Sequence, residues 1–210
     1  LLLECSPLVI GCEQGEWMCP LLENNINTLA VRAGQTRTPE NEHRDPLFLT
    51  SSFIFTDAED AAQKFAENVP GNIYSRFTNP TVKAFESRLA ALEDAPYCIA
   101  TASGMSAILT LALALLKMGD RVAVSTGVFG STVSLFTNIL NRFGVESDFV
   151  PLTDFERWTT TVSATTRLLF IETPSNPLSE VGDIGALADL AHRNDCLLAV
   201  DNAYCTPALQ

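Results

Sequence analysis

Short apolar runs alternate with helical patterns through the second half of the chain. Strand-like runs occupy 97–101, 121–125, 147–150, 167–171 and 196–200, and segments with helical spacing separate them. Runs that are apolar at successive positions are typical of strands buried on both faces of a parallel sheet. The pattern therefore predicts an α/β fold of three layers, in which helices cover both faces of a mostly parallel sheet.

The first half of the chain is more polar and is predicted to contain separate helices. Thr56 and Glu59 have capping-box spacing, so a helix should begin at this point. Asn79 and Pro80 suit the N-cap and first turn of a second helix, which should run to about Glu93. We expect the apolar residues of this helix to face inward, namely Val82, Phe85, Leu89 and Leu92.

Polar or aromatic residues follow three of the predicted strands. Asp201 comes directly after 196–200, Phe129 lies just beyond 121–125, and Asn176 stands between two prolines after 167–171. In open α/β sheets, ligands bind beyond the carboxyl ends of the strands, so these side chains are candidates for one ligand site. The alternatives are that Asp201 only begins a turn and that Phe129 packs in the core.

Two other places in the sequence suit an anion. Ser103, Gly104 and Met105 open a predicted helix, where free backbone N–H groups can bind a phosphate-sized group. Tyr74 and Arg76 are alternate residues of a loop and can hold one phosphate or carboxylate together, although a solvent-facing arginine is the alternative. The glycine fingerprints of nucleotide sites are missing, which makes a Rossmann module a poor competitor.

Charge and cysteine content restrict the partners. The formal net charge is −12, which argues against nucleic acid and against an anionic membrane surface. The six cysteines lack metal-site spacing, so we expect a reduced, cytoplasmic protein without a metal site. Residues 1–26 form an atypical segment that fits neither a signal peptide nor a membrane span, and no role is assigned to it.

The groups expected at the strand ends are an anion site, an aromatic ring, an amide and a carboxylate. Together they suit a flat, phosphorylated ring that contains nitrogen. A carboxylate beside a pyridine nitrogen keeps that nitrogen protonated, and the ring then acts as an electron sink. Pyridoxal phosphate (PLP) is a ligand with these properties.

Four sequence motifs occur in order along the chain: YSRFTNPT at 74–81, SGM at 103–105, ETPSNP at 172–177 and VDNAYCTP at 200–207. They resemble the Cys/Met-metabolism family of fold-type I PLP-dependent enzymes over about 28–210. The resemblance implies an incomplete three-layer αβα fold of the aspartate aminotransferase type. It also implies an N-terminal arm and helix at 27–75 that contribute to a neighbouring subunit, and the first part of the large PLP-binding domain at 76–210.

The resemblance implies how the cofactor phosphate is held. Gly104 and Met105 would supply backbone amides beside Ser103, and Tyr74 and Arg76 would reach the phosphate of a neighbouring subunit. The active protein would then be a homo-oligomer, usually a dimer of dimers.

The resemblance also implies roles around the cofactor ring. Asp201 would bind the ring nitrogen, and Phe129 would stack on the ring. Asn176 would lie near the ring hydroxyl and the carboxylate of a small amino-acid substrate.

Two positions bear on the reaction that the resemblance implies. Phe129 stands where the family usually has Tyr, and Ser131 stands where methionine γ-lyases tend to have Cys, which weighs against lyase chemistry. The stretch 128–132 is most similar to the O-succinylhomoserine sulfhydrylase branch, which makes homocysteine and succinate from O-succinylhomoserine and sulfide. The alternatives within the family are cystathionine γ-synthase and a related γ-lyase.

The implied chemistry requires a lysine that forms a Schiff base with the cofactor. The chain has three lysines, Lys64, Lys83 and Lys117, and each lies on or at the end of a predicted helix. The family places the required lysine in a Ser-x-Thr-Lys motif that would lie beyond Gln210, with the C-terminal domain. We therefore expect a truncated chain that contains no catalytic residue and is inactive alone. The alternative of another class is a non-catalytic remnant or truncated gene product.

Overall fold

The computed structural model describes residues 2–4 and 25–210, in two compact units. One unit contains residues 101–210 together with β1 (Leu2–Glu4), and the other contains residues 25–100. Most of the atypical segment 1–26 therefore lies outside the described residues.

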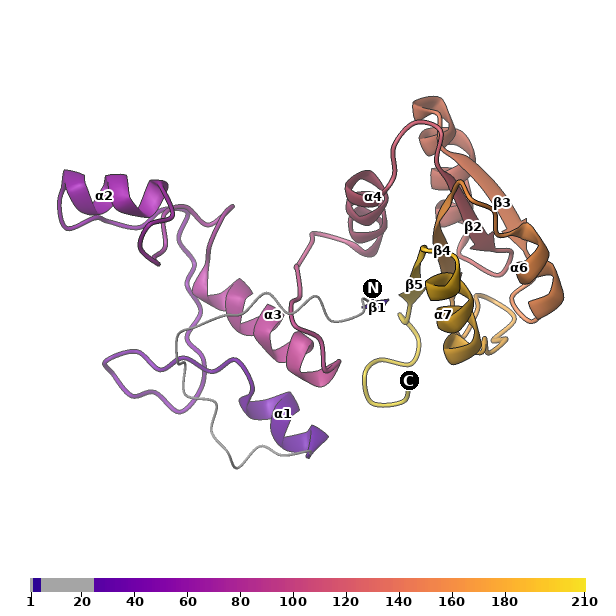
Figure 1. Cartoon of the computed structure of the whole chain (residues 1–210). Helices are drawn as coiled ribbons and strands as arrows, with labels where there is room; N and C mark the ends of the chain where they lie inside the picture. Colours follow the sequence, from indigo (N-terminus) through magenta and orange to yellow (C-terminus); the bar gives the residue numbers. More distant parts are fainter. Residues whose placement is uncertain (1, 5–24) are drawn as a thin grey trace. The chain divides into compact units, whose positions relative to one another are not determined.

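A sheet with the order β1-β5-β4-β2-β3 forms the centre of the unit that holds residues 101–210 (Figure 1). Four neighbouring strands are parallel, and β1 pairs antiparallel with β5 at one edge. The parallel strands are β2 (Arg121–Ser125), β3 (Glu146–Val150), β4 (Thr166–Glu172) and β5 (Leu197–Asp201). The predicted strands at 121–125, 147–150, 167–171 and 196–200 are thus confirmed to within one residue at their ends.

Successive residues of each central strand enter opposite layers of the core. Val124 and Phe170 pack with α4 (Gly104–Leu115) and with the helical segment after β2, whereas Leu169 and Val200 pack with the helices on the other face. Those helices are α6 (Phe155–Thr161) and α7 (Ile184–Arg193). The sheet is therefore buried on both faces, and the predicted three-layer αβα arrangement is confirmed.

The helical segment after β2 is irregular. The chain forms α5 (Gly130–Ser134), the π-helix η2 (Leu135–Ile139) and the 3-10 helix η3 (Leu140–Phe143) in succession. Gly144 ends the segment with a φ of 77°, a left-handed conformation that glycine adopts without strain.

The predicted strand at 97–101 is wrong, because these residues pair with no strand of the described sheet. The Ala100 amide instead donates to the Glu86 carboxylate at 2.7 Å. Tyr97 and Ile99 are about four-fifths exposed, so the apolar run is not buried here as its composition suggested.

Three helices form the unit of residues 25–100: α1 (Ile26–Arg32), α2 (Ala58–Phe65) and α3 (Pro80–Leu92). Asn79 caps α3 as predicted, since its side chain accepts from the Thr81 amide at 2.9 Å. The predicted cap of α2 is wrong by one residue, because Asp57, and not Thr56, accepts the amide of the third helical residue. A carboxylate is the stronger acceptor at a helix N-terminus.

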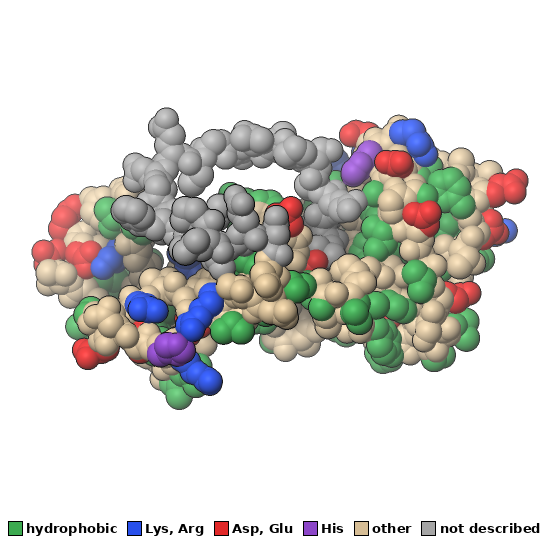
Figure 2. Space-filling model, turned by 90° about the horizontal axis from the view of Figure 1, so that it is seen from below, with side chains coloured by type: hydrophobic (Ala, Val, Ile, Leu, Met, Phe, Trp, Pro, Cys, Tyr) green, Lys and Arg blue, Asp and Glu red, His purple; other side chains and the backbone are tan. Residues whose placement is uncertain are grey.

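Polar contacts tie helix α3 to the preceding chain. Arg88 donates to the Ala33 carbonyl at 2.8 Å and to the Asp45 carboxylate at 2.7 Å. The prediction that Val82 and Phe85 face inward is wrong, because their side chains are 41% and 55% exposed. Figure 2 shows hydrophobic side chains in green on the surface among polar and charged ones.

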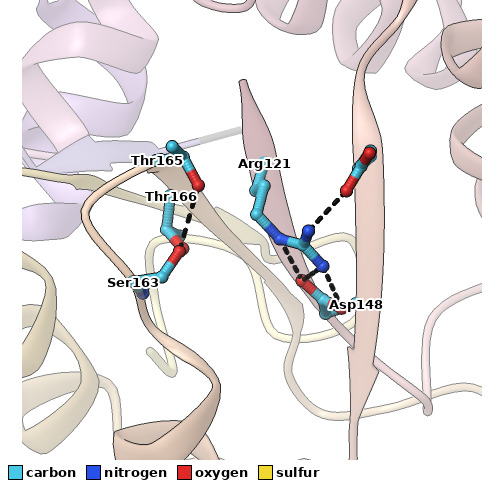
Figure 3. A network of polar contacts seen from close by, with 6 residues as sticks. Arg121, Asp148, Ser163, Thr165 and Thr166 are labelled. Atoms are coloured by element: carbon cyan, nitrogen blue, oxygen red, sulfur yellow. Dashed lines mark hydrogen bonds and ion pairs between the residues drawn. The ribbon is translucent and has the colours of Figure 1, made fainter. Parts of the chain in front are cut away.

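An ionic cluster closes the amino edge of the sheet (Figure 3). Arg121, the first residue of β2, donates to Asp148 on β3 through Nε at 3.0 Å and Nη2 at 2.8 Å, and it also pairs with Glu146. The Arg121 amide donates to the Thr165 carbonyl. In the turn before β4, the Ser163 hydroxyl forms hydrogen bonds with the hydroxyls of Thr165 and Thr166. These contacts join the starts of three neighbouring strands.

Among residues 2–4 and 25–210, no helix is long and apolar enough to cross a membrane.

We predict that Trp158→Ala destabilises the sheet unit strongly. Trp158 of α6 is fully buried against the sheet, and its indole Nε1 donates to the Pro151 carbonyl at 3.0 Å. The substitution should lower the free energy of unfolding by about 3–5 kcal/mol in urea denaturation followed by circular dichroism. Phe155→Ala is the matched control on the same helix, where the side chain is 42% exposed and a loss of about 1 kcal/mol is expected. Equal losses for the two variants would contradict the packing described.

Candidate functional site

Chain order and spatial order of the strands differ around β2. From β2 the chain passes to β3 on one side, and then returns to β4 on the other side of β2. In open α/β sheets such a switch point marks the place beyond the carboxyl ends where ligands bind. The residues that follow β2, β4 and β5 are therefore the ones from which a site is built.

Asp201 is the last residue of β5, at this carboxyl edge. It is half-buried, and one carboxylate oxygen accepts the Ala203 amide at 3.1 Å. The local turn expected as the alternative is thus present, and it holds the carboxylate at the end of the strand. In the register of the sheet, Asp201 lies opposite Glu172, the last residue of β4.

Glu172 is a buried carboxylate that the sequence argument left without a role. It is 3% exposed, and Oε2 accepts the backbone amide of Phe129 at 2.7 Å. Burial raises the pKa of Glu172 above its ordinary value, the hydrogen bond from Phe129 opposes this, and the charge of Asp201 adds to it. The signal in the sequence was an acid directly after a buried strand, the same signal that singled out Asp201.

Phe129 precedes α5, just beyond the carboxyl end of β2, and its ring is half exposed. Its side chain is 50% exposed, so the core packing considered as an alternative does not describe it. Its carbonyl accepts the Thr132 amide at 2.8 Å, and its own amide is held by Glu172. The backbone N–H and C=O of Phe129 are thus both hydrogen-bonded. An exposed aromatic ring on a backbone held in this way is suited to stacking on a flat ligand.

Asn176 lies in the loop after β4, between the cis peptide bonds that precede Pro174 and Pro177. Its backbone amide donates to the Gly127 carbonyl at 3.1 Å. Within the described residues its side-chain amide makes no hydrogen bond, so it is available to a ligand. A Cβ on Gly127 would lie 2.8 Å from the Ser175 Cβ, so only glycine allows this approach of the two loops.

The N-terminus of α4 offers two free amides. Ser103 caps the helix, and its side chain and that of Ser106 form a reciprocal capping box. The amides of Gly104 and Met105 have no acceptor in the described part of the chain. A Cβ built on Gly104 meets nothing within 4 Å, so space for an anion is open beside these amides.

A contact between side chains brings α4 beside the Phe129 segment. The Thr132 hydroxyl, on the first turn of α5, lies 3.9 Å from the Met105 sulfur. The structure thus brings the α4 N-terminus, Phe129, Asn176 and Asp201 to one region of a single unit. These groups fit a flat ring with an anionic substituent and a protonated nitrogen.

Tyr74 and Arg76 belong to the unit of residues 25–100 and are described only within it. The Arg76 guanidinium lies 5.7 Å from the centre of the Tyr74 ring and 4.9 Å from that of Phe77. The two side chains therefore lie together, in a turn where the Phe77 amide donates to the Tyr74 carbonyl at 2.8 Å, and Tyr74 is 43% exposed.

None of the three lysines lies at the carboxyl end of a strand. Lys117 is in the turn that leads into β2, at the amino edge of the sheet and thus at the opposite end from Asp201. Lys64 of α2 pairs with Asp60 at 2.9 Å, and Lys83 lies on α3. These positions agree with the expectation from the sequence that none of the three lysines follows a strand.

Known proteins resemble this chain in sequence. An O-succinylhomoserine sulfhydrylase of Pseudomonas aeruginosa is 59% identical over 200 residues, which is 93% of this chain and 50% of that protein. An L-methionine gamma-lyase of Fusobacterium nucleatum is 37% identical over 186 residues, covering 88% of this chain and 47% of the relative. The chain spans about half the length of the curated relatives it matches.

The fold has a close counterpart among solved structures. A putative O-acetylhomoserine (thiol)-lyase of Campylobacter jejuni, which carries a pyridoxyl-lysine phosphate, matches with a TM-score of 0.83 at 30% identity. The match covers 88% of this chain and 46% of that one. The profile of the Cys/Met metabolism PLP-dependent enzymes matches residues 27–210, and this chain belongs to that family of enzymes.

Proposed function

We propose that this chain supplies the first part of the PLP site of a longer enzyme that performs γ-replacement on an activated homoserine. The observation that carries the proposal is that Phe129, Asn176 and Asp201 meet at the switch point of the sheet, beside the free amides of α4. Residues 27–75 are then an arm toward a neighbouring subunit, and residues 76–210 are the beginning of the large cofactor-binding domain.

The α4 N-terminus holds the cofactor phosphate in this proposal. Gly104 and Met105 donate their amides, and the missing Cβ of Gly104 lets the oxygens approach. The positive end of the helix dipole favours the anion. Ser103 orients this turn through its capping box and presents its hydroxyl on the same side.

Asp201, Phe129 and Asn176 hold the cofactor ring. Asp201 accepts a hydrogen bond from the protonated ring nitrogen and keeps the proton there, while Phe129 stacks on the ring face. Asn176 donates to the ring hydroxyl and to the substrate carboxylate. When bound, PLP supplies an electron sink for negative charge that develops at the substrate α-carbon.

Tyr74 and Arg76 reach the cofactor phosphate of a neighbouring copy, which makes the active protein a homo-oligomer, as a dimer of dimers. Their mutual approach supports this, because a phenol and a guanidinium held together form one anion-binding pair. Large exposed apolar side chains in the same unit also support an interface: Leu47, Leu49, Ile54, Phe77 and Phe85.

O-succinylhomoserine and sulfide are the substrates we propose, with homocysteine and succinate as products of a step in methionine biosynthesis. Support comes from Phe129, whose ring lacks the hydroxyl needed for proton transfer in elimination, and from the 59% identity to the Pseudomonas sulfhydrylase. Cystathionine γ-synthase, which uses cysteine as the nucleophile, is the second candidate, followed by a γ-lyase.

The 210-residue chain by itself is proposed to be inactive, because none of its three lysines follows a strand of the sheet. Among the described cysteines, Cys98, Cys196 and Cys205 are free thiols, which supports a reducing, cytoplasmic location. A non-catalytic remnant is the alternative from another class, and binding of PLP by the chain would argue against it.

We predict that Asp201→Asn weakens PLP binding by the chain about tenfold or more, because a hydrogen bond to a charged group contributes about 1.5–3 kcal/mol. Titration of the chain with PLP, followed by absorbance, measures the dissociation constant. Asp195→Asn is the matched control, since this exposed residue precedes β5 at the other edge and has a φ of 55° that Asn tolerates. Equal affinities for the unchanged chain and Asp201→Asn would contradict the role of Asp201.

Borohydride reduction tests the position of the lysines. After incubation of the chain with PLP and reduction, peptide mass spectrometry should find no stoichiometric adduct on Lys64, Lys83 or Lys117. Only weak surface labelling is expected, because Lys117 lies at the amino edge of the sheet and Lys64 and Lys83 lie on helices of the other unit. A single lysine labelled in stoichiometric amount would refute this arrangement of the site.

A chimera tests the reaction. Residues 27–210 replace the corresponding half of the Pseudomonas aeruginosa sulfhydrylase, and homocysteine is measured with sulfide and either O-succinylhomoserine or O-acetylhomoserine. We expect activity within about tenfold of the parent enzyme and a preference for the succinyl ester, since conservative changes outside the reacting groups cost about 1 kcal/mol. Preference for cysteine would favour the synthase, and a correctly folded but inactive chimera would favour the remnant.

A further inference from the structure

A second carboxylate lies beside Asp201 at the carboxyl edge of the sheet. Glu172 ends β4 in direct register with Asp201 and is 3% exposed. Within the described residues, no Lys or Arg forms an ion pair with Glu172. A buried carboxylate without a cation is costly, so its hydrogen bonds must offset that cost.

Two hydrogen bonds of Glu172, one through its carboxylate and one through its amide, are directed at the end of β2. Oε2 accepts the Phe129 amide at 2.7 Å, and the Glu172 amide meets the hydroxyl of buried Ser125 at 3.4 Å. Phe129 is also the residue before α5, and α5 has no side-chain cap of its own. The Glu172 carboxylate therefore accepts one of the backbone amides that the start of this helix leaves without an intrahelical partner.

The ring of Phe129 depends on this backbone contact for its position. The side chain is half exposed, so other residues pack against only one side of the ring. The loop that carries it is otherwise tied to the β4 loop through Gly127, whose carbonyl accepts the Asn176 amide at 3.1 Å. Glu172 and Gly127 thus set the distance between the stacking ring and the amide of Asn176.

We propose that Glu172 is a positioning residue of the PLP site, which holds the Phe129 backbone so that its ring lies against the cofactor ring. This inference rests on the proposed function and concerns a residue to which that function assigns no contact with the ligand. Its effect on the cofactor passes through Phe129.

The titration of Glu172 provides a readout that does not need the cofactor. Burial raises its pKa, the Phe129 hydrogen bond opposes the rise, and Asp201 on β5 adds to it. Ser125 on β2 and the Phe129 amide are the other groups that face it. Since the folded-state pKa is raised, the contribution of Glu172 to stability should be fully present below the ordinary glutamate pKa and should be lost as pH rises through the raised one. Glu172→Gln should remove this part of the pH dependence.

Two substitutions separate the acceptor from the charge. Glu172→Gln keeps an oxygen that can accept the Phe129 amide, whereas Glu172→Leu keeps the approximate volume without an acceptor. Amide hydrogen exchange of the chain without PLP should show Phe129 protected in the unchanged protein and in Glu172→Gln. Exchange should be about tenfold faster or more in Glu172→Leu, as expected for a lost hydrogen bond. Equal protection of Phe129 in Glu172→Leu overturns the proposal.

The same variants are titrated with PLP. Glu172→Leu should raise the dissociation constant about fivefold to tenfold, as expected when an aromatic contact worth about 1 kcal/mol is displaced. Glu172→Gln should change it by less than about twofold. Glu146→Gln, in the ionic cluster at the amino edge, is the control that should leave both PLP affinity and Phe129 protection unchanged.

A double-mutant cycle tests whether Glu172 acts through Phe129. Phe129→Ala removes the ring, so adding Glu172→Leu to it should weaken PLP binding by no more than about a further twofold. Additive losses overturn the proposal, since Glu172 would then act by another route. Loss of PLP binding in Asp201→Asn but not in Glu172→Leu overturns this inference alone, whereas no PLP binding by the unchanged chain overturns the proposed function as well.

Discussion

Burial of the parallel sheet on both faces is the constraint on which the rest of this structure depends. The central strands β2, β4 and β5 direct successive side chains into two apolar layers, one closed by α4 and the segment after β2, the other by α6 and α7. The buried middle of such a strand has no place for a charge. Polar groups therefore collect where the strands end, and Glu172 and Asp201 follow from that rule.

The acidic side chains at the two edges of the sheet differ in whether a basic side chain pairs with them. At the amino edge, Arg121 neutralises Asp148 and Glu146, so the acids there are satisfied by the protein itself. At the carboxyl edge, Glu172 and Asp201 form no ion pair with a Lys or Arg among the described residues. Asp201, which has no basic partner among the described residues, is suited to a ligand that brings a protonated nitrogen.

The residues that approach such a ligand are held by backbone contacts more than by side-chain packing. The amides of Phe129 and Asn176 are both bound across the gap between the β2 and β4 loops, while their side chains remain free. The hydrogen bonds fix the backbone of Phe129 and Asn176, and the ring and the side-chain amide stay available to a ligand. The unit of residues 25–100 differs, because polar contacts such as Arg88 with Asp45 hold it and much of its apolar surface is exposed.

The sequence by itself determined the four parallel strands of the sheet, the cap of α3, the start of α4 and the candidate residues at the strand ends, because burial on two faces and capping leave periodic and local signals. It did not determine the irregular helix after β2, the absence of a strand at 97–101, or the exposure of Phe85, since these depend on which partners are available in space. Only the tertiary structure decided that Glu172 binds the Phe129 amide and faces Asp201. That contact joins residues 43 positions apart, and no local pattern encodes the register of two parallel strands.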